Sequence, residues 1–378
     1  MIPYIQSIAT GAPATRLSQE EAAQFVASLP GHEMTSSRVM AIYENTRIKE
    51  RHLAYSLLSP DAMTFLREHG TISQRMAMYR EYAIPLAERV AREAIKRAGI
   101  SPGEITQLVF VTSTGFSAPG IDAALIERLG LKRSTSRNPV TFMGCAAAMV
   151  GLRTACDHVL ARKSRKSLVV CLELSSLNAT LEDDLNDVII HSIFGDGCAA
   201  VVVGALPEEE IPEGSIRIVD TLTHLSEGTS DGIVLGIRDN GITCTLSRSL
   251  PDYIGGLRPV MEDFLKLNKK DQQEIGRWAI HPGGTKILGS VQKCLGLTDT
   301  DISHSWEVLS EYGNTLSCAV LFVLERMLYV TSKEEVNNSG IELTRQDSPT
   351  GETASSPYAV ALSFSPGVGV EGILLEFT

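Results

Sequence analysis

Residues 141–148 read Thr-Phe-Met-Gly-Cys-Ala-Ala-Ala, a stretch in which a strand ends and a helix begins. Gly144 permits a backbone conformation that other residues avoid, and the small residues after Cys145 leave room for a substrate to reach its sulfur. A thiol at a helix N-terminus lies near the positive end of the helix dipole, which favours the thiolate. The backbone N–H of Cys145 is a candidate donor to an oxyanion. The alternative is an inert core cysteine, because cysteine is among the most buried residue types.

An apolar helical pattern follows Cys145, and a second one follows Asn314. This repetition indicates a duplicated α/β unit. We therefore expect two halves, an N-terminal half of residues 1–205 that carries the cysteine and a C-terminal half of residues 206–378. The acidic, proline-containing residues 206–214 are typical of a linker between them.

Apolar stretches of strand length alternate with helical patterns along the chain, which predicts an α/β architecture. The predicted strands are residues 108–112, 168–172, 199–203, 216–219, 278–280, 359–364 and 372–377. The predicted helices are residues 84–98, 146–161, 257–266, 286–295 and 315–329. Residues 331–357 are polar and predict a long surface loop.

Two further residues complete a possible set of reactive groups with Cys145. His281 follows a predicted strand and is followed by Pro-Gly-Gly, which places its side chain where α/β proteins carry their sites. Asn314 follows a glycine, and its amide is a candidate donor to a developing negative oxygen. When each residue is considered alone, the non-catalytic alternative is a loop hydrogen bond for His281 and helix capping for Asn314. Together the three supply a nucleophile, a base and a donor, although spacing alone does not show that they meet.

The composition excludes several classes of function. The 378 residues include 34 Lys+Arg and 45 Asp+Glu, and the net charge of −11 argues against a nucleic-acid binder. We find no apolar run long enough to span a membrane and no secretory signal. The seven cysteines form no CxxC pair, which predicts a reduced, cytoplasmic protein without a zinc site. We also find no dinucleotide-binding glycine loop and no histidine spacing that suits a metal.

Four segments occur in the order seen in type III polyketide synthases: Gly144-Cys145, Phe194-Gly195-Asp196-Gly197-Cys198-Ala199-Ala200, His281-Pro282-Gly283-Gly284 and Gly313-Asn314. The chain therefore resembles the chalcone-synthase-like enzymes of the thiolase superfamily. The resemblance implies a thiolase-like fold of duplicated αβαβα layers with mixed five-stranded sheets, and it implies a homodimer.

The resemblance also implies a Cys145–His281–Asn314 triad. The Cys145 thiolate, paired with a His281 imidazolium, attacks the thioester of a starter acyl-CoA. Malonyl-CoA then loses carbon dioxide, and Asn314 and His281 stabilise the enolate that attacks the bound acyl group. No metal or organic cofactor is expected.

Phe194 matches the family's gatekeeping phenylalanine between the CoA tunnel and the cavity, and a core phenylalanine is the alternative.

Differences from the plant enzymes bear on the cavity. Cys244 and Ala118 stand where chalcone synthases have a second gatekeeping phenylalanine and a methionine that crosses the dimer interface. We therefore expect a wider pocket, a fatty or bulky acyl starter and a pyrone, resorcinol or similar product. Leu316, in place of a small residue, narrows one side. The other expected substrate-binding residues are Thr114, Asn178, and Pro366 and Gly367 of the closing loop. Ordinary core packing is the alternative for all of them.

Binding of CoA phosphates requires cations at a tunnel mouth. Arg38 matches one of the family's basic positions, while Arg47 and Lys49 are nearby candidates, with Arg51 as a further alternative. For each of them taken singly, a solvated basic face is the alternative and the simpler explanation.

Two other functions remain open from the sequence. The first is a condensation like that of ketoacyl synthase III, with substrates delivered by an acyl carrier protein. Those enzymes usually have His-Gln-Ala-Asn where this chain has His281-Pro282-Gly283-Gly284. The second is a catalytically silent family member that binds acyl-CoA.

Overall fold

One mixed sheet of nine strands runs through the molecule, in the order β11-β14-β15-β8-β1-β7-β6-β4-β5. The structure is a computed structural model, and it describes residues 1–29, 36–56, 58–67, 70–162, 164–180, 184–331, 343–345 and 356–378. The N-terminal half contributes β1 (Ile2–Gly11), β4 (Gln107–Thr112), β5 (Ser136–Thr141), β6 (Ser167–Leu174) and β7 (Asp196–Leu206). The C-terminal half contributes β8 (Ile216–Leu225), β11 (Ile275–Ile280), β14 (Tyr358–Ser365) and β15 (Gly369–Phe377).

Each half expected from the sequence has its own part of this sheet. β4 runs parallel to β5 and β6, and β6 is antiparallel to β7. In the second part, β11 is parallel to β14 and β14 is antiparallel to β15, so both parts are mixed. The first part has the expected five strands, whereas the second has four in this sheet. The parts are not separate sheets, because β1 and β8 pair at Tyr4–Arg217 and Ile5–Ile216.

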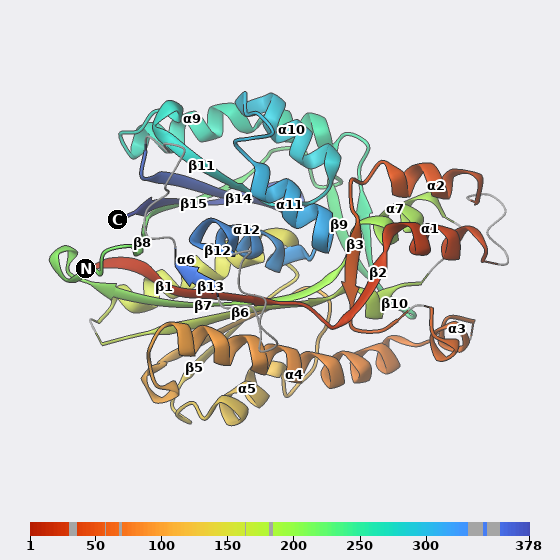
Figure 1. The fold of residues 1–378 in the computed structure, drawn as a ribbon, viewed down its shortest axis with the longest axis horizontal. Helices are drawn as coiled ribbons and strands as arrows, with labels where there is room; N and C mark the ends of the chain where they lie inside the picture. The colour runs from red at the N-terminus through yellow and green to blue at the C-terminus, as the bar shows by residue number, and fades with distance from the viewer. Residues whose placement is uncertain are drawn as a thin grey trace.

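Helices and sheet form five layers, as the resemblance implied (Figure 1). The middle layer is made of α6 (Ala147–Leu160) and α12 (Ala319–Leu328), whose apolar residues share one core with both parts of the sheet. Helices α4 (Ile72–Arg97) and α5 (Ile121–Leu129) cover the outer face of the first part. The outer face of the second part is covered by α8 (Leu250–Gly255), α9 (Leu257–Leu267) and α10 (Thr285–Leu295). The αβαβα prediction is therefore confirmed.

The smaller elements gather mainly at one end of the molecule, on the right of Figure 1. They are β2 (Thr15–Ser18), α1 (Gln19–Ala27), α2 (Ser36–Glu44), β3 (Glu50–Leu53), α3 (Pro60–Arg67), α7 (Leu185–Ile193), β9 (Ile233–Arg238) and β10 (Gly241–Leu246). Helix α11 (Ser303–Tyr312) leads to Asn314, while β12 (Tyr329–Thr331) pairs with β13 (Leu343–Arg345). Most of the predicted surface loop 331–357 lies outside the described residues.

All seven predicted strands are present, but the start of one long helix was predicted wrongly and the edge strand β5 was missed. Helix α4 begins at Ile72, twelve residues before the predicted start at residue 84, behind a capping box of Thr71 and Gln74. Its first turns are largely polar, so apolar periodicity did not mark them. Strand β5 was not predicted because it is polar and contains Pro139, which an edge strand tolerates.

Candidate active site

A strained turn presents Cys145 at the start of the middle layer. After β5, Phe142 and Gly144 both have φ of 56°, a left-handed conformation that is costly for phenylalanine. Residues 144–146 form a single 3-10 turn that leads into α6. The Gly144 N–H donates to Ser113 Oγ over 3.0 Å. The sequence prediction of a cysteine at a strand-to-helix junction agrees with this placement, and Cys145 is partly exposed.

Asn314 lies in the equivalent turn of the C-terminal half. Gly313 has φ of 66° and Leu316 φ of 47°, and a 3-10 turn again precedes the middle helix, here α12. The Asn314 side-chain oxygen accepts from the Leu316 N–H over 2.8 Å, so the asparagine does stabilise the start of the turn. Its amide nitrogen lies 4.0 Å from Cys145 Sγ and donates to the Gly283 carbonyl over 3.4 Å. The capping interpretation is therefore supported, and the role of the amide as a donor to a negative oxygen stays a prediction.

His281 lies directly after β11, and its backbone N–H donates to Leu362 O over 2.8 Å. The side chain is 1% exposed, and neither ring nitrogen has a hydrogen-bond partner within the described chain. A Cβ atom added to Gly283 would lie 3.2 Å from His281 Nε2, so the imidazole lies against this glycine. Because the Asn314 amide reaches Gly283 and the Cys145 sulfur, one small region holds all three predicted residues.

The protonation states differ from the ion pair expected from the sequence. Burial lowers the pKa of His281 to about 3, so its imidazole is neutral at physiological pH. Burial also raises the pKa of the Cys145 thiol, an effect that neighbouring Cys244 increases and the hydrogen bond from Asn314 opposes. The position of Cys145 before α6 does not outweigh its desolvation. Burial therefore favours a neutral thiol and a neutral imidazole.

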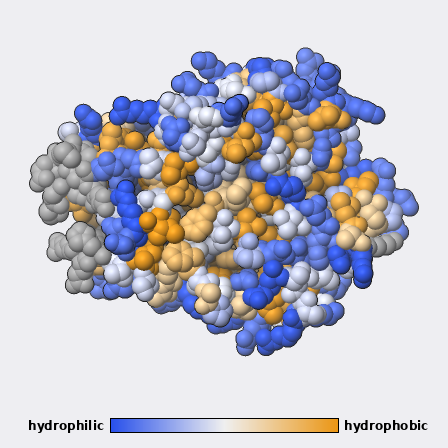
Figure 2. Space-filling model, turned by 180° about the vertical axis from the view of Figure 1, so that it is seen from behind, coloured by the Kyte–Doolittle hydropathy of each residue, from blue (hydrophilic) through white to orange (hydrophobic). Residues whose placement is uncertain are grey.

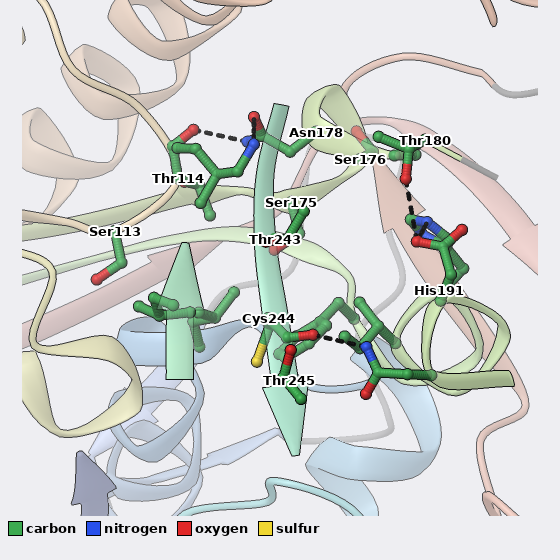
Figure 3. Close-up of a pocket in the computed structure, with 18 of the residues that line it drawn as sticks. Ser113, Thr114, Ser175, Ser176, Asn178, Thr180, His191, Thr243, Cys244 and Thr245 are labelled. Carbon is green, nitrogen blue, oxygen red and sulfur yellow. Dashed lines mark hydrogen bonds and ion pairs between the residues drawn. The ribbon is translucent and has the colours of Figure 1, made fainter. Parts of the chain in front are cut away.

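A pocket lies beside this region, and it includes five of the eight predicted substrate-binding residues: Thr114, Asn178, Phe194, Cys244 and Leu316. In the view of Figure 3, Thr114 and Asn178 lie above Cys244, which is carried by β10. Asn178 Nδ2 donates to the Thr114 carbonyl over 2.8 Å. The remaining lining residues are Arg51, Leu53, Ser113, Ser175, Ser176, Ala179, Thr180, Asp184, Asn186, Asp187, Ile190, His191, Leu235, Arg238, Ile242, Thr243 and Thr245.

Phe194 and Asn314 are held in register by a short parallel bridge between the two halves. The Gly195 N–H donates to the Asn314 carbonyl over 3.0 Å, and the Asn314 N–H donates to the Ile193 carbonyl over 2.9 Å. Phe194 lines the pocket, so a pocket residue and Asn314 are parts of one backbone unit.

Three predicted substrate-binding residues are not among those that line this pocket. Ala118 is exposed in the loop between β4 and α5. Pro366 and Gly367 form the turn between β14 and β15. Pro366 nevertheless packs on the nucleophile turn, since a Cβ atom on Gly144 would lie 3.0 Å from its Cδ.

The predicted CoA-binding cations lie on one exposed segment. Arg38 is on α2, and Arg47 and Lys49 follow it, all three exposed. The Arg47 guanidinium stacks on Trp306 at 4.5 Å. Arg51 is different, because it is only 3% exposed and donates to backbone carbonyls.

Sequence reasoning missed a buried carboxylate between the two turns. Glu173 on β6 accepts hydrogen bonds from the Ser113 N–H, the Thr114 hydroxyl and the Ser317 hydroxyl, the last over 2.6 Å. Burial raises its pKa to about 7, while these donors oppose the shift. A single acid within the apolar run Leu168–Leu174 was the available signal, because such a residue requires partners.

The described part of the chain contains no group of His, Cys, Asp and Glu suited to a metal ion. Within the same residues, no helix combines the length and apolar character that crossing a membrane requires. All seven cysteines are free.

Comparisons with known proteins give a consistent result. Family models of the N-terminal and C-terminal domains of chalcone and stilbene synthases match residues 3–207 and 218–377. The alpha-pyrone synthesis polyketide synthase-like Pks18 of Mycobacterium tuberculosis is 42% identical over 380 residues, which cover 99% of this chain and 91% of that protein. The 3,5-dihydroxyphenylacetyl-CoA synthase of Streptomyces toyocaensis is 28% identical, with coverage of 99% and 90%. The crystal structure of PKS-I from the brown alga Ectocarpus siliculosus is 39% identical, with a TM-score of 0.89 and coverage of 100% and 98%.

Proposed function

The chain belongs to the family of chalcone and stilbene synthases, and we propose from this premise that Cys145, His281 and Asn314 are its catalytic triad. It is a type III polyketide synthase, an acyltransferase that condenses malonyl-CoA with an acyl-CoA starter, as the resemblance predicted. Its substrates are CoA thioesters, and the family uses no further cofactor.

The neutral state of the site suggests how the reaction begins. As the Cys145 sulfur attacks the starter thioester, the His281 imidazole accepts the thiol proton and passes it to the departing CoA sulfur. The acyl group is then bound to Cys145 as a thioester. A neutral His281 is the required form, because a protonated imidazole cannot act as a base.

Extension follows when malonyl-CoA enters. Its carboxylate leaves as carbon dioxide, and the resulting enolate oxygen accepts hydrogen bonds from the Asn314 amide and an N–H of His281. The enolate carbon attacks the acyl carbonyl, the bond to Cys145 breaks, and the chain is two carbons longer. The single observation that carries this proposal is the Asn314 amide, 4.0 Å from the Cys145 sulfur and bonded to Gly283 beside His281.

The pocket supports a fatty or otherwise bulky starter. Cys244 lines it in place of a large aromatic residue, and Leu235, Ile190 and Ile242 add apolar surface. The printed name of the mycobacterial relative refers to alpha-pyrone synthesis. We therefore favour a pyrone or a related ring as the product.

We further propose that CoA enters beside α2. Arg38, Arg47 and Lys49 are exposed there, and the Thr285 hydroxyl at the start of α10 donates to the Asn45 carbonyl over 3.3 Å. This contact brings the basic segment to the turn that follows His281. The three cations are then available to the phosphates of CoA.

We propose a cytoplasmic homodimer with halves at residues 1–205 and 206–378. Strand β5 is a mostly exposed edge of the sheet, and Phe116 and Ala118 are exposed in the neighbouring loop. Unpaired edges and exposed apolar residues favour association. Apolar patches also lie among hydrophilic residues on the face shown in Figure 2.

The test is incubation with malonyl-CoA and a panel of acyl-CoA starters, with products identified by mass spectrometry. Cys145→Ala should abolish all products, while Cys156→Ala, a change at a buried thiol of α6, should retain them. Carrier-bound starters form a separate arm, and activity only in that arm would support the carrier-protein alternative. Products from Cys145→Ala would refute the nucleophile, and a wild type that neither loads acyl groups nor releases carbon dioxide would support a silent protein.

A further inference from the structure

A buried arginine lies beneath the backbone that carries Phe194. Arg51 on β3 is 3% exposed, and its Nη1 donates to the carbonyl oxygens of His191 and Phe194, the latter over 2.9 Å. These carbonyls are at the C-terminus of α7, the negative end of its dipole. The Arg51 charge therefore holds the end of the helix from which the Phe194 side chain projects.

The stem of the same arginine contacts the segment that carries Asn314. A Cβ atom on Gly313 would lie 3.0 Å from Arg51 Cγ, and one on Gly195 would lie 3.6 Å from Arg51 Cβ. Gly313 and Gly195 each adjoin the bridge between Phe194 and Asn314. Arg51 thus contacts both sides of the bridge, one with its head group and the other with its stem.

Gln19, the first residue of α1, supports this arrangement. Its side-chain oxygen accepts from Arg51 Nε over 3.1 Å, and its amide donates to Thr46 Oγ1 over 2.8 Å and to the Ser192 carbonyl over 2.7 Å. Gln19 is therefore bound to both the arginine and the last turn of α7. The two residues form one buried polar unit under the gate.

Burying the charged guanidinium of Arg51 costs free energy, because the group is removed from water. Burial lowers the pKa of Arg51, whereas Tyr43 and the buried carboxylate of Asp196 favour its charged form. Apolar residues of similar volume often fill such sites without loss of stability. The backbone contacts of Arg51 concern the Phe194–Asn314 unit, while the Cys145 turn is held by Ser113 and Pro366. Because Arg51 contacts the Phe194–Asn314 unit and not the Cys145 turn, its role is to position residues for one step of the reaction.

We propose that Arg51, supported by Gln19, is a positioning residue that holds Phe194 and Asn314 in the arrangement required for decarboxylation of malonyl-CoA. This inference rests on the proposed roles of Cys145 and Asn314. Loading of the starter requires the Cys145 turn, which Arg51 does not hold. A change of Arg51 therefore affects extension more than loading.

The experiment compares Arg51→Lys and Gln19→Ala with Arg97→Lys. Arg97 is a matched control, because it also donates to a backbone carbonyl, that of Ile8, and to two carboxylates away from the pocket. Loading is measured as the mass increase of the protein with an acyl-CoA alone. Decarboxylation is measured as labelled carbon dioxide released from malonyl-CoA, and thermal unfolding reports the stability of each variant.

We expect Arg51→Lys to slow the release of carbon dioxide at least ten-fold more than it slows loading. Gln19→Ala leaves the Arg51 charge in place, so it should lower the ratio of the decarboxylation rate to the loading rate by a smaller factor. This variant tests the proposal if Arg51→Lys does not fold. Arg97→Lys should leave the ratio of the two rates unchanged. Equal losses of loading and decarboxylation in the Arg51 and Gln19 variants would refute the proposal. Failure of the wild type in both assays would instead refute the proposed function.

Discussion

Replacing Glu173 by Gln should alter how stability depends on pH, because this carboxyl group is buried between the turns that carry Cys145 and Asn314. Its pKa is about 7 in the folded protein and 4.5 in the absence of burial. Between these values the folded state binds more protons than the unfolded state, so the free energy of unfolding falls as pH rises. Two and a half pKa units correspond to about 3.4 kcal/mol, and the part lost between pH 5 and pH 8 is about 2.5 kcal/mol.

The Glu173→Gln variant lacks this titration but retains a similar shape. The remaining side-chain oxygen can accept from the Ser113 N–H or from the Thr114 hydroxyl, and the Ser317 hydroxyl can turn to accept from the new amide. We therefore expect the variant to gain about 2.5 kcal/mol relative to the wild type between pH 5 and pH 8.

Urea unfolding at pH 5, 6, 7 and 8 measures this difference. Subtracting the wild-type curve from the variant curve cancels groups that both proteins share, such as His281. As a control, Glu20→Gln changes an exposed carboxyl group on α1 and should leave the curve nearly parallel to the wild type. A difference that stays flat with pH, or that falls as pH rises, would show that Glu173 is not held protonated by burial.

Three other changes test the pocket, the bridge and the histidine. Cys244→Phe should lower kcat/KM for long starters at least ten-fold and spare short ones in product assays, whereas Cys244→Ser should spare both. Gly195→Ala places a Cβ atom 2.3 Å from Tyr312 O, so we expect urea unfolding to show a free energy of unfolding that is lower by about 1–3 kcal/mol. In the control Gly289→Ala, the new Cβ atom meets no atom within 4 Å, so this variant should be as stable as the wild type. The His281 pKa of about 3 lies below its unfolded value of 6.5, so stability is lost as pH falls between them, by about 1.4 kcal/mol per unit. His281→Asn should remove this slope, and an unchanged slope would contradict the burial argument.

The local features of the site could be predicted from the sequence. Gly144 before Cys145, Gly313 before Asn314 and the apolar helices after them follow rules that act within a few residues. The duplicated architecture followed from the same repetition, and the five layers confirm it. Strand β5 and the first turns of α4 could not be predicted in this way, because neighbours in space, rather than their own apolar pattern, stabilise them.

Local turn and helix preferences, which depend on adjacent residues, predicted an α/β fold and three candidate reactive residues. The resemblance to type III polyketide synthases added the five layers and the grouping of these residues as a triad. Only the tertiary structure decided that the Asn314 amide lies 4.0 Å from the Cys145 sulfur, that burial lowers the pKa of His281 and that Arg51 is buried. It also placed Ala118 outside the pocket and Glu173 between the turns. Desolvation and contact arise from segments that are far apart in the chain, and no local pattern encodes how much water their packing excludes.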